Sequence, residues 1–322
     1  MKKIAVWGLG RHAINNILPA ISSCEELYLQ GLFTRDESIR NEYSRLYNCI
    51  SYSSHEEMLN DDSLSIVYLS TPPGLHYKQG LEILESGKHF WSEKPFVTSS
   101  DQAYRLIELS DKHDLTLAEG LMYRYHPQFE YIRDFVNGNL GEILFLNSFF
   151  TLPKIDSPGF RYKADLGGSS LLDIGIYPIS LCMELMNFEK PQLLSAKLSF
   201  DDVSKVDTNG FVLLQFASGL TATLVWGMGY GYRNDLDILT KNGSLFTERI
   251  YSKNPEYEPQ ILLKDKVGNE SKILSRQNNH FISMFNHFSS MLNNSKKEKE
   301  EKERILKLTD AIDEIRNLGL ND

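Results

Sequence analysis

The chain has 322 residues, of which 41% are hydrophobic and 24% charged, as in a globular protein long enough for two domains. Its formal net charge of −9 argues against a nucleic-acid-binding surface, which would show clustered basic residues. The cysteines, Cys24, Cys49 and Cys182, and the histidines show neither a disulfide framework nor a metal-binding spacing, so we expect no metal.

The sequence also predicts a compartment. No apolar run approaches the roughly 18–20 residues of a membrane span. The N-terminus enters a strand pattern without the apolar core and cleavage site of a signal peptide. We therefore expect a cytoplasmic protein with no membrane partner.

A buried strand at residues 3–7 runs directly into the turn Gly8-Leu9-Gly10-Arg11-His12-Ala13, which opens a helical run. In a dinucleotide-binding turn the first glycine permits the tight bend and the second lets the backbone approach a pyrophosphate, while a small third residue allows close packing. The helix N-terminus then offers free N–H groups to the phosphates. This pattern favours a cofactor site at Gly8, Gly10, Arg11 and His12 over a plain strand–helix turn.

A second strand at residues 27–33 ends in Thr34-Arg35-Asp36. An acid at this strand end usually binds the ribose 2′-hydroxyl of NAD(H), whereas an arginine accommodates the 2′-phosphate of NADP(H). Thr34 and Arg35 therefore favour NADP(H) over NAD(H). Asp36 keeps NAD(H) open, and Arg35 could also be a solvated charge.

Strand and helix patterns continue to alternate up to residue 121, which predicts a parallel, doubly wound sheet with ligands at the carboxyl ends of its strands. Thr71-Pro72 and Glu93-Lys94 follow two of these strands, so we expect both on the same edge as the glycine turn. An X-Pro bond adopts the cis form more readily than other peptide bonds, so Lys94-Pro95 is a candidate fixed corner that aims the lysine.

From residue 122 to residue 322 the pattern changes, and we expect a second, α+β domain with an open, mostly antiparallel sheet. A helix is predicted from Pro127 to Gly138. Residues 296–304 are almost all charged and are expected to be solvated. The helix that follows, about residues 303–318, should dock on the body of the protein through Ile305, Leu308, Ile312 and Ile315. Strands are predicted at residues 143–151, 193–200, 210–216, 221–226 and 235–240.

The segment from Gly167 to Pro178 carries a polar pair in an apolar helix. Asp173 and Tyr177 are four residues apart, so they share a helix face. Polar groups in so apolar a stretch need hydrogen-bond partners or a ligand. The pattern alone supports a buried structural pair and a functional site equally.

Together these motifs resemble the glucose–fructose oxidoreductase, inositol dehydrogenase and rhizopine-catabolism (Gfo/Idh/MocA) oxidoreductases along nearly the whole chain. No single motif is specific, but six occur in the family's order and spacing. The matching segments are Gly8-Leu9-Gly10, Thr71-Pro72 with Leu75-His76-Tyr77, Gly87-Lys88-His89 leading to Glu93-Lys94-Pro95, Tyr123-Arg124-Tyr125-His126-Pro127, Phe160-Arg161, and Gly167 to Pro178.

The resemblance implies a Rossmann domain followed by an α+β domain whose open sheet forms a homodimer or homotetramer interface. It implies that Lys94 lies beside the nicotinamide and that the helix with Asp173 and Tyr177 faces it. Tyr177 stands where most of the family has histidine, as in the glucose–fructose oxidoreductase, dihydrodiol dehydrogenase and nucleotide-sugar ketoreductase branches, which generally favour NADP(H). The chain departs from the family pattern at Pro73 and Ser169.

The activity implied is hydride transfer between NADP(H) and a sugar-like hydroxyl or carbonyl group of an aldose, cyclitol, diol or keto-sugar. A nucleotide-sugar ketoreductase and a non-catalytic cofactor-binding regulator are the alternatives. We expect Tyr177 to be the general acid/base and Lys94 to polarise the reacting oxygen, although the two roles could be exchanged. Asp173 would bind a neighbouring hydroxyl or hold Lys94. Weaker candidates for the pocket wall are Tyr123 and Arg161, and further cofactor-site candidates are Thr71, Pro72, His76, Glu93 and Arg124. A structural role, capping or positioning the loops that they begin, is favoured for His76 and His126.

Overall fold

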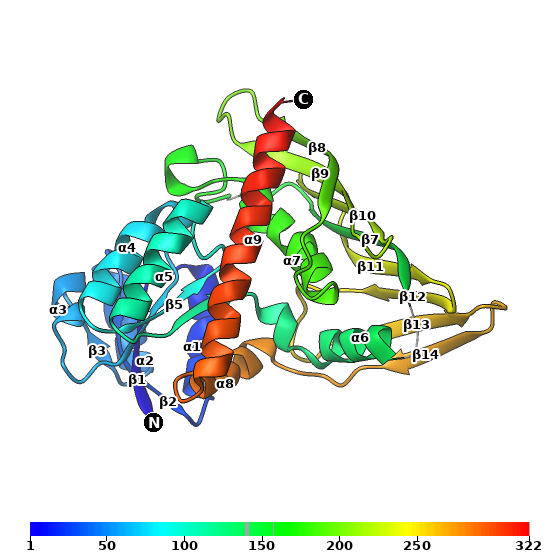
Figure 1. Ribbon diagram of the computed structural model, residues 1–322. Coiled ribbons are helices and arrows are strands. Elements are labelled where there is room, and N and C mark those ends of the chain that lie inside the picture. The colour runs from blue at the N-terminus through cyan, green and yellow to red at the C-terminus, as the bar shows by residue number, and fades with distance from the viewer. Residues whose placement is uncertain (139–141, 157, 322) are drawn as a thin grey trace. The chain divides into compact units, whose positions relative to one another are not determined.

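The computed structural model describes residues 1–138, 142–156 and 158–321. It divides into two compact units (Figure 1). The first comprises Met1–Leu121 and Phe281–Thr309, and the second comprises Met122–His280 and the residues from Asp310 onward.

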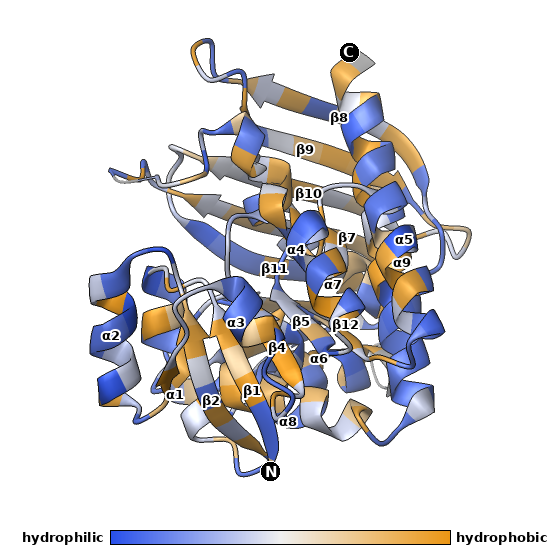
Figure 2. Cartoon of the chain, turned by 90° about the vertical axis from the view of Figure 1, so that its left-hand side faces the viewer, coloured by the Kyte–Doolittle hydropathy of each residue, from blue (hydrophilic) through white to orange (hydrophobic). Residues whose placement is uncertain are grey.

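The first unit is built on a six-stranded sheet in which all neighbouring strands are parallel. This confirms the predicted doubly wound sheet. The order β3-β2-β1-β4-β5-β6 changes direction between β1 and β4, and ligands of such sheets bind at this switch point. Figure 2 shows β1 and β2 mainly hydrophobic, as expected of strands buried on both faces. The strands are β1 (Lys2–Trp7), β2 (Leu27–Phe33), β3 (Ile50–Ser51), β4 (Ile66–Leu69), β5 (His89–Glu93) and β6 (Leu117–Gly120).

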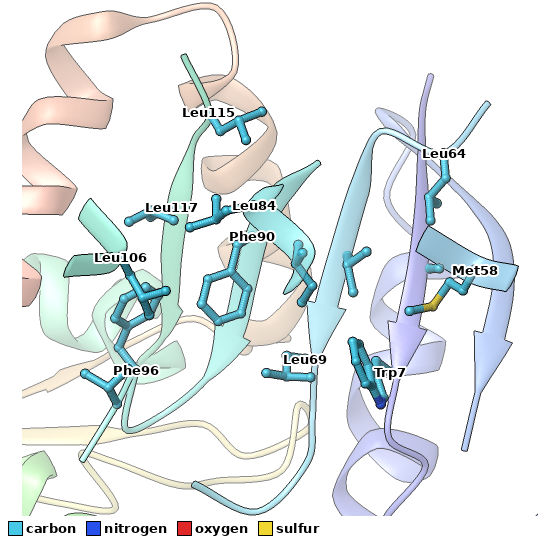
Figure 3. Packing of buried hydrophobic residues seen from close by; sticks show 14 of the residues in the cluster. Trp7, Met58, Leu64, Leu69, Leu84, Phe90, Phe96, Leu106, Leu115 and Leu117 are labelled. Atoms are coloured by element: carbon cyan, nitrogen blue, oxygen red, sulfur yellow. The ribbon is translucent and has the colours of Figure 1, made fainter. Parts of the chain in front are cut away.

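Helices cover both faces of this sheet. On one face, a core cluster joins sheet residues such as Trp7 and Phe90 to Met58 and Leu106 from the helices (Figure 3). On the other, Phe285 of α8 packs edge-on against Tyr68 with ring centroids 5.2 Å apart. The helical elements are η1 (Ala13–Ile17), α1 (Leu18–Ser22), α2 (Glu37–Leu46), α3 (His55–Leu59), α4 (Pro73–Glu85), α5 (Ser100–Lys112) and α8 (His280–Met291).

The second unit contains an eight-stranded sheet in the order β14-β13-β12-β11-β7-β10-β9-β8. Among the described strands of this second sheet, only the β7–β10 pair is parallel, which confirms the predicted mostly antiparallel sheet. The sequence prediction lacked β12, β13 and β14. The strands are β7 (Ile143–Leu152), β8 (Gln192–Phe200), β9 (Asp207–Gln215), β10 (Thr221–Met228), β11 (Arg233–Thr240), β12 (Gly243–Glu248), β13 (Gln260–Asp265) and β14 (Glu270–Leu274).

One face of this second sheet packs against the apolar helix α7 (Ile176–Leu185), which contacts β7 and β10. Within the described residues, the helical stretch Ala164–Leu185 is long and apolar enough to resemble a membrane span. An 18-residue window of this stretch has a mean hydropathy of 1.3. However, 83% of that window is buried inside the structure, as in a core helix. The remaining helices of this unit are η2 (Met122–Tyr125), α6 (Pro127–Gly138), η3 (Ala164–Leu166) and η4 (Leu171–Gly175).

The last helix, α9 (Ser295–Asn321), begins earlier than predicted. The expectation that residues 296–304 are solvated is wrong for Glu301, Lys302 and Arg304, whose exposed fractions are 3%, 8% and 3%. These charges are buried because each has an oppositely charged partner. Lys302 pairs with Asp111 at 2.7 Å and with Glu298 at 2.6 Å.

Candidate cofactor and catalytic site

The glycine turn follows β1 at the switch point of the first sheet. Gly8 has a φ of +104°, and a Cβ there would lie 2.6 Å from the carbonyl oxygen of Ser70, so only glycine fits. A Cβ at Gly10 would meet nothing within 4 Å, so the backbone is open to a ligand on that side. The backbone N–H of Ile14 donates to the carbonyl of Gly10 at 3.0 Å and begins the helix. This geometry suits the pyrophosphate of a dinucleotide.

The end of β2 presents two different side chains to solvent. Arg35 is exposed and forms no ion pair within the described residues. Asp36 caps α2, because its Oδ1 accepts the backbone N–H groups of Ser38 at 3.0 Å and Ile39 at 3.2 Å. Hydrogen bonds from the Ser38 side chain and from Ile39 lower the pKa of Asp36. The Asp36 carboxylate is therefore engaged in capping α2.

Arg40, which the sequence prediction missed, supports this strand end. Its side chain is 8% exposed, and its Nη1 donates to the carbonyl of Thr34 at 2.9 Å. Its Nε donates to Ser51 Oγ at 3.1 Å. Arg40 therefore fixes the backbone from which Arg35 projects. In the sequence, this role of Arg40 is indicated only by a cation on the inner face of an otherwise amphipathic helix.

His76 joins the two loops that follow β4 and β5. It is fully buried, and its ring nitrogens lie 2.9 Å from the carbonyl oxygens of Thr71 and Pro95. Burial lowers the pKa of His76, and the two backbone hydrogen bonds oppose that shift. Pro73 is the first residue of α4, where proline is favoured. The helix start therefore accommodates proline at this position.

Lys94 follows directly on β5, and the Lys94-Pro95 bond is cis, as predicted. The neighbouring Glu93 Oε1 accepts the Tyr68 hydroxyl at 2.6 Å and lies 3.1 Å from Nε2 of His12, at the glycine turn. Burial alone would raise the pKa of Glu93, but the His12 and Tyr68 contacts and the charge of Lys94 together lower it. Glu93 is therefore an anion that connects the glycine turn to the lysine corner.

In the second unit, Asp173 lies in η4 and Tyr177 in the first turn of α7. Their exposed fractions are 7% and 6%. Asp173 Oδ2 accepts a hydrogen bond from Arg161 Nε at 2.5 Å, so two of the predicted site residues form an ion pair. The Tyr177 hydroxyl lies 3.6 Å from the sulfur of Met122. Asp207, which the sequence prediction missed, accepts the Leu171 N–H at 2.8 Å and anchors the start of η4.

Gly175 allows this helix to lie against the sheet. A Cβ at Gly175 would be 2.8 Å from Cδ2 of Trp226, a fully buried residue of β10. The glycine between Asp173 and Tyr177 is therefore needed for packing.

Three residues of the segment 122–126 are buried, namely Met122, Tyr123 and His126. Tyr123 is fully buried, and its hydroxyl lies 2.8 Å from Ser180 Oγ. Arg124 forms an ion pair with Glu184. Burial, helped by Lys253 and Arg276, lowers the pKa of His126 to about 3, so this histidine is neutral. Among the described residues, no group of His, Cys, Asp and Glu side chains could hold a metal.

Comparison with known proteins defines the class of protein. Residues 2–121 match the oxidoreductase family with an NAD-binding Rossmann fold, and residues 129–246 match the GFO/IDH/MocA C-terminal domain. The chain is 30% identical over 274 residues to a dTDP-3,4-didehydro-2,6-dideoxy-alpha-D-glucose 3-reductase of Streptomyces violaceoruber, covering 84% of this chain and 80% of the relative. It is 27% identical to D-xylose 1-dehydrogenase (NADP(+)) 2 of Haloferax volcanii, over 78% of this chain and 77% of the relative.

A solved structure extends the similarity over almost the full length. The 3-ketoreductase KijD10 of Actinomadura kijaniata, in complex with NADP and TDP-benzene, superposes with a TM-score of 0.94 at 25% identity. The match covers 98% of this chain and 97% of that one. The protein is therefore an oxidoreductase with an NAD(P)-binding Rossmann domain. It belongs to the Gfo/Idh/MocA family, as the sequence motifs predicted.

Proposed function

We propose that this enzyme reduces a nucleotide-linked keto-sugar with NADPH. The observation that carries the proposal is the nearly full-length match to a 3-ketoreductase crystallised with NADP and TDP-benzene. Further relatives with 3-reductase names come from Saccharopolyspora spinosa, at 28% identity, and Actinomadura kijaniata, at 26%. Oxidation of a free aldose is the second candidate, because the xylose dehydrogenase of Haloferax volcanii is also a relative.

The preference for NADP(H) rests on the end of β2. Arg35 is exposed and makes no ion pair within the described part of the chain, so its guanidinium is available to a 2′-phosphate. Asp36 would have to give up its helix-capping bonds to reach a ribose 2′-hydroxyl. Both observations favour NADP(H) over NAD(H).

The chemistry needs a proton donor and a positive charge. When bound, reduced nicotinamide supplies the hydride to the carbonyl carbon. Tyr177 donates its hydroxyl proton to the carbonyl oxygen as the C–O double bond becomes a single bond, and solvent reprotonates the tyrosinate. Lys94 stabilises the negative charge that develops on that oxygen. The ion pair with Asp173 holds the Arg161 guanidinium ready for a polar group of the substrate.

The open face of the second sheet supports a homo-oligomer. Figure 1 shows α6 and α7 on one side of this sheet. On the other side, strand pairing aligns Phe145 with Leu239, Phe149 with Val225, and Phe246 with Leu262, and Leu239 and Leu262 are 52% and 43% exposed. The same face carries the polar pair Asn147 and Asp237, but exposed apolar side chains gathered in this way are typical of an interaction surface. We propose that a second copy covers it, in a reducing cytoplasm where Cys24, Cys49 and Cys182 remain the free thiols observed.

The first test is a fluorescence titration of the wild type and Arg35→Ala with NADPH and NADH. We expect NADPH to bind the wild type more tightly and Arg35→Ala to lose at least about tenfold in NADPH affinity alone, since a charge-assisted hydrogen bond contributes about 1.5–3 kcal/mol. Equal or tighter binding of NADH, unaffected by Arg35→Ala, would refute the 2′-phosphate argument.

The second test separates the candidate activities. A nucleotide-sugar reductase should bind dTDP in calorimetry and oxidise NADPH when a dTDP-linked keto-sugar is added. An aldose dehydrogenase should ignore dTDP and reduce NADP⁺ with free sugars. Tyr177→Phe and Lys94→Met should each lower kcat by about 10²–10⁴ while the cofactor still binds. Cofactor binding without turnover of any sugar would make the regulator the better description.

A further inference from the structure

The first unit contains a buried charge cluster outside the cofactor site. It consists of Glu119 at the end of β6 and of Glu301 and Arg304 on α9, with exposed fractions of 1%, 3% and 3%. Arg304 donates from Nε and Nη2 to the two carboxylate oxygens of Glu301, at 2.8 and 2.6 Å. Its Nη1 donates to Glu119 Oε2 at 3.0 Å. One guanidinium thus joins two carboxylates from distant parts of the chain.

The cluster is bonded directly to the lysine corner. The remaining carboxylate oxygen of Glu119, Oε1, accepts the backbone N–H of Phe96 at 2.7 Å, and Phe96 is two residues after Lys94. Glu301 Oε1 in turn accepts the N–H of Glu119 at 3.2 Å. On the other side of the corner, His76 lies 2.9 Å from the Pro95 carbonyl. The backbone beyond Lys94 is therefore held at two consecutive residues.

Stability alone does not account for such a cluster. Two carboxylates and one guanidinium must be desolvated, and apolar residues of similar volume often make a protein equally or more stable. What apolar residues cannot supply is an acceptor for the Phe96 N–H, which would otherwise be a buried, unsatisfied donor. Two backbone N–H groups, those of Phe96 and Glu119, donate to these carboxylates.

We propose that Glu119, Arg304 and Glu301 are positioning residues that fix the Phe96 amide and thereby the place of Lys94 at the end of β5. The catalytic consequence rests on the proposed function, in which Lys94 stabilises the developing alkoxide. The cluster acts through the backbone and touches neither cofactor nor substrate. It makes α9, a helix from the other end of the chain, part of the support of the catalytic lysine.

The test compares Arg304→Met with Lys302→Met. Lys302 lies on the same helix and is similarly buried, but its partners are Asp111 and Glu298, which do not bond the corner. Arg304→Met should lower kcat by about 10- to 100-fold, since a displacement of about 1 Å costs this much, with the NADPH Kd changed less than about twofold. In hydrogen–deuterium exchange, the peptide of residues 94–98 should lose protection. Lys302→Met should leave both kcat and that peptide near the wild type.

Glu119 gives an independent pair of variants in case Arg304→Met does not fold. Glu119→Gln retains an acceptor oxygen for the Phe96 N–H but places its NH2 group against the Arg304 donor, so it should lose less of kcat and less of the protection than Glu119→Leu, which removes both acceptors. Equal effects of Arg304→Met and Lys302→Met, or of Gln and Leu at Glu119, would overturn the proposal. The exchange measurement needs no substrate. If no sugar is turned over, the proposed function fails, but the exchange of the peptide of residues 94–98 still tests whether the cluster fixes the Phe96 amide.

Discussion

The substitution Gly175→Ala tests whether packing of one helix sets the geometry of the second unit's candidate catalytic residues. Gly175 lies two residues from both Asp173 and Tyr177. An added Cβ would be 2.8, 2.9 and 3.1 Å from Cδ2, Cε2 and Cγ of Trp226. Ordinary carbon–carbon contacts are about 3.5–4.0 Å, so helix and indole must separate by roughly 0.5–1 Å. The indole is fully buried and cannot move into solvent.

The expected cost follows from two opposing effects. Overpacking a tight core costs about 1–3 kcal/mol, and replacing a helical glycine by alanine recovers up to about 1 kcal/mol. A Cβ at Gly175 would lie only 2.8 Å from a ring atom of a fully buried indole, so overpacking should outweigh the gain in helix propensity. We therefore expect a net loss near 2 kcal/mol in the free energy of unfolding. The displaced helix carries Tyr177, so kcat should fall by about 10- to 100-fold.

The matched control is Gly138→Ala at the end of α6, where a Cβ would meet nothing within 4 Å. Urea unfolding, steady-state kinetics and NADPH titration should be run on both variants. Gly138→Ala should behave like the wild type, and Gly175→Ala should keep its NADPH affinity because the glycine turn belongs to the other unit. If Gly175→Ala matches Gly138→Ala in both stability and kcat, the packing argument is refuted.

Three further predictions concern single side chains. Burial, helped by Lys2, lowers the pKa of His89 from 6.5 to about 4. The unfolded chain therefore binds this proton first, and stability should fall as the pH drops below 6.5, by about 2 kcal/mol at pH 5; urea unfolding of His89→Gln should show a pH dependence weaker by that amount. Asp36→Ala should lower the urea midpoint by uncapping α2 yet leave the NADPH preference unchanged, and a switch toward or away from NADH would contradict the capping role. Asp207→Ala should cost about 1–2 kcal/mol in unfolding free energy, since it leaves the Leu171 N–H buried without its acceptor; an unchanged midpoint would exclude this anchor.

The features predicted well from the sequence are those set by interactions between near neighbours in the chain. The strand–glycine–helix order around Gly8 follows from backbone sterics, because only glycine adopts the required φ. The start of the helix at Pro127 was predicted, since proline marks the first position of a helix locally. Alternating strand and helix periods sufficed to predict the parallel sheet of the first unit, and the order of the six motifs indicated the family.

Roles that depend on partners far along the chain could be decided only by the tertiary structure. His76, a cofactor-site candidate with a structural alternative in the sequence, is buried in the fold, and one of its ring nitrogens lies 2.9 Å from the carbonyl oxygen of Pro95 in the next loop. The short strands β13 and β14 acquire their hydrogen bonds only by pairing, and β14 is largely exposed and polar, so neither carries a clear alternation.

The charged run at residues 296–304 shows most clearly the difference between what near neighbours determine and what distant partners determine. In sequence it is a solvated stretch, because isolated charges are costly to bury. Arg304 is buried nevertheless, since Glu119, which lies 185 positions away in the chain, reaches it in the folded unit. Composition and periodicity predicted most of the helices and strands, and the six motifs indicated the family to which the chain belongs. The fold alone decided which charges find partners, because a buried charge is tolerated only where distant residues meet it.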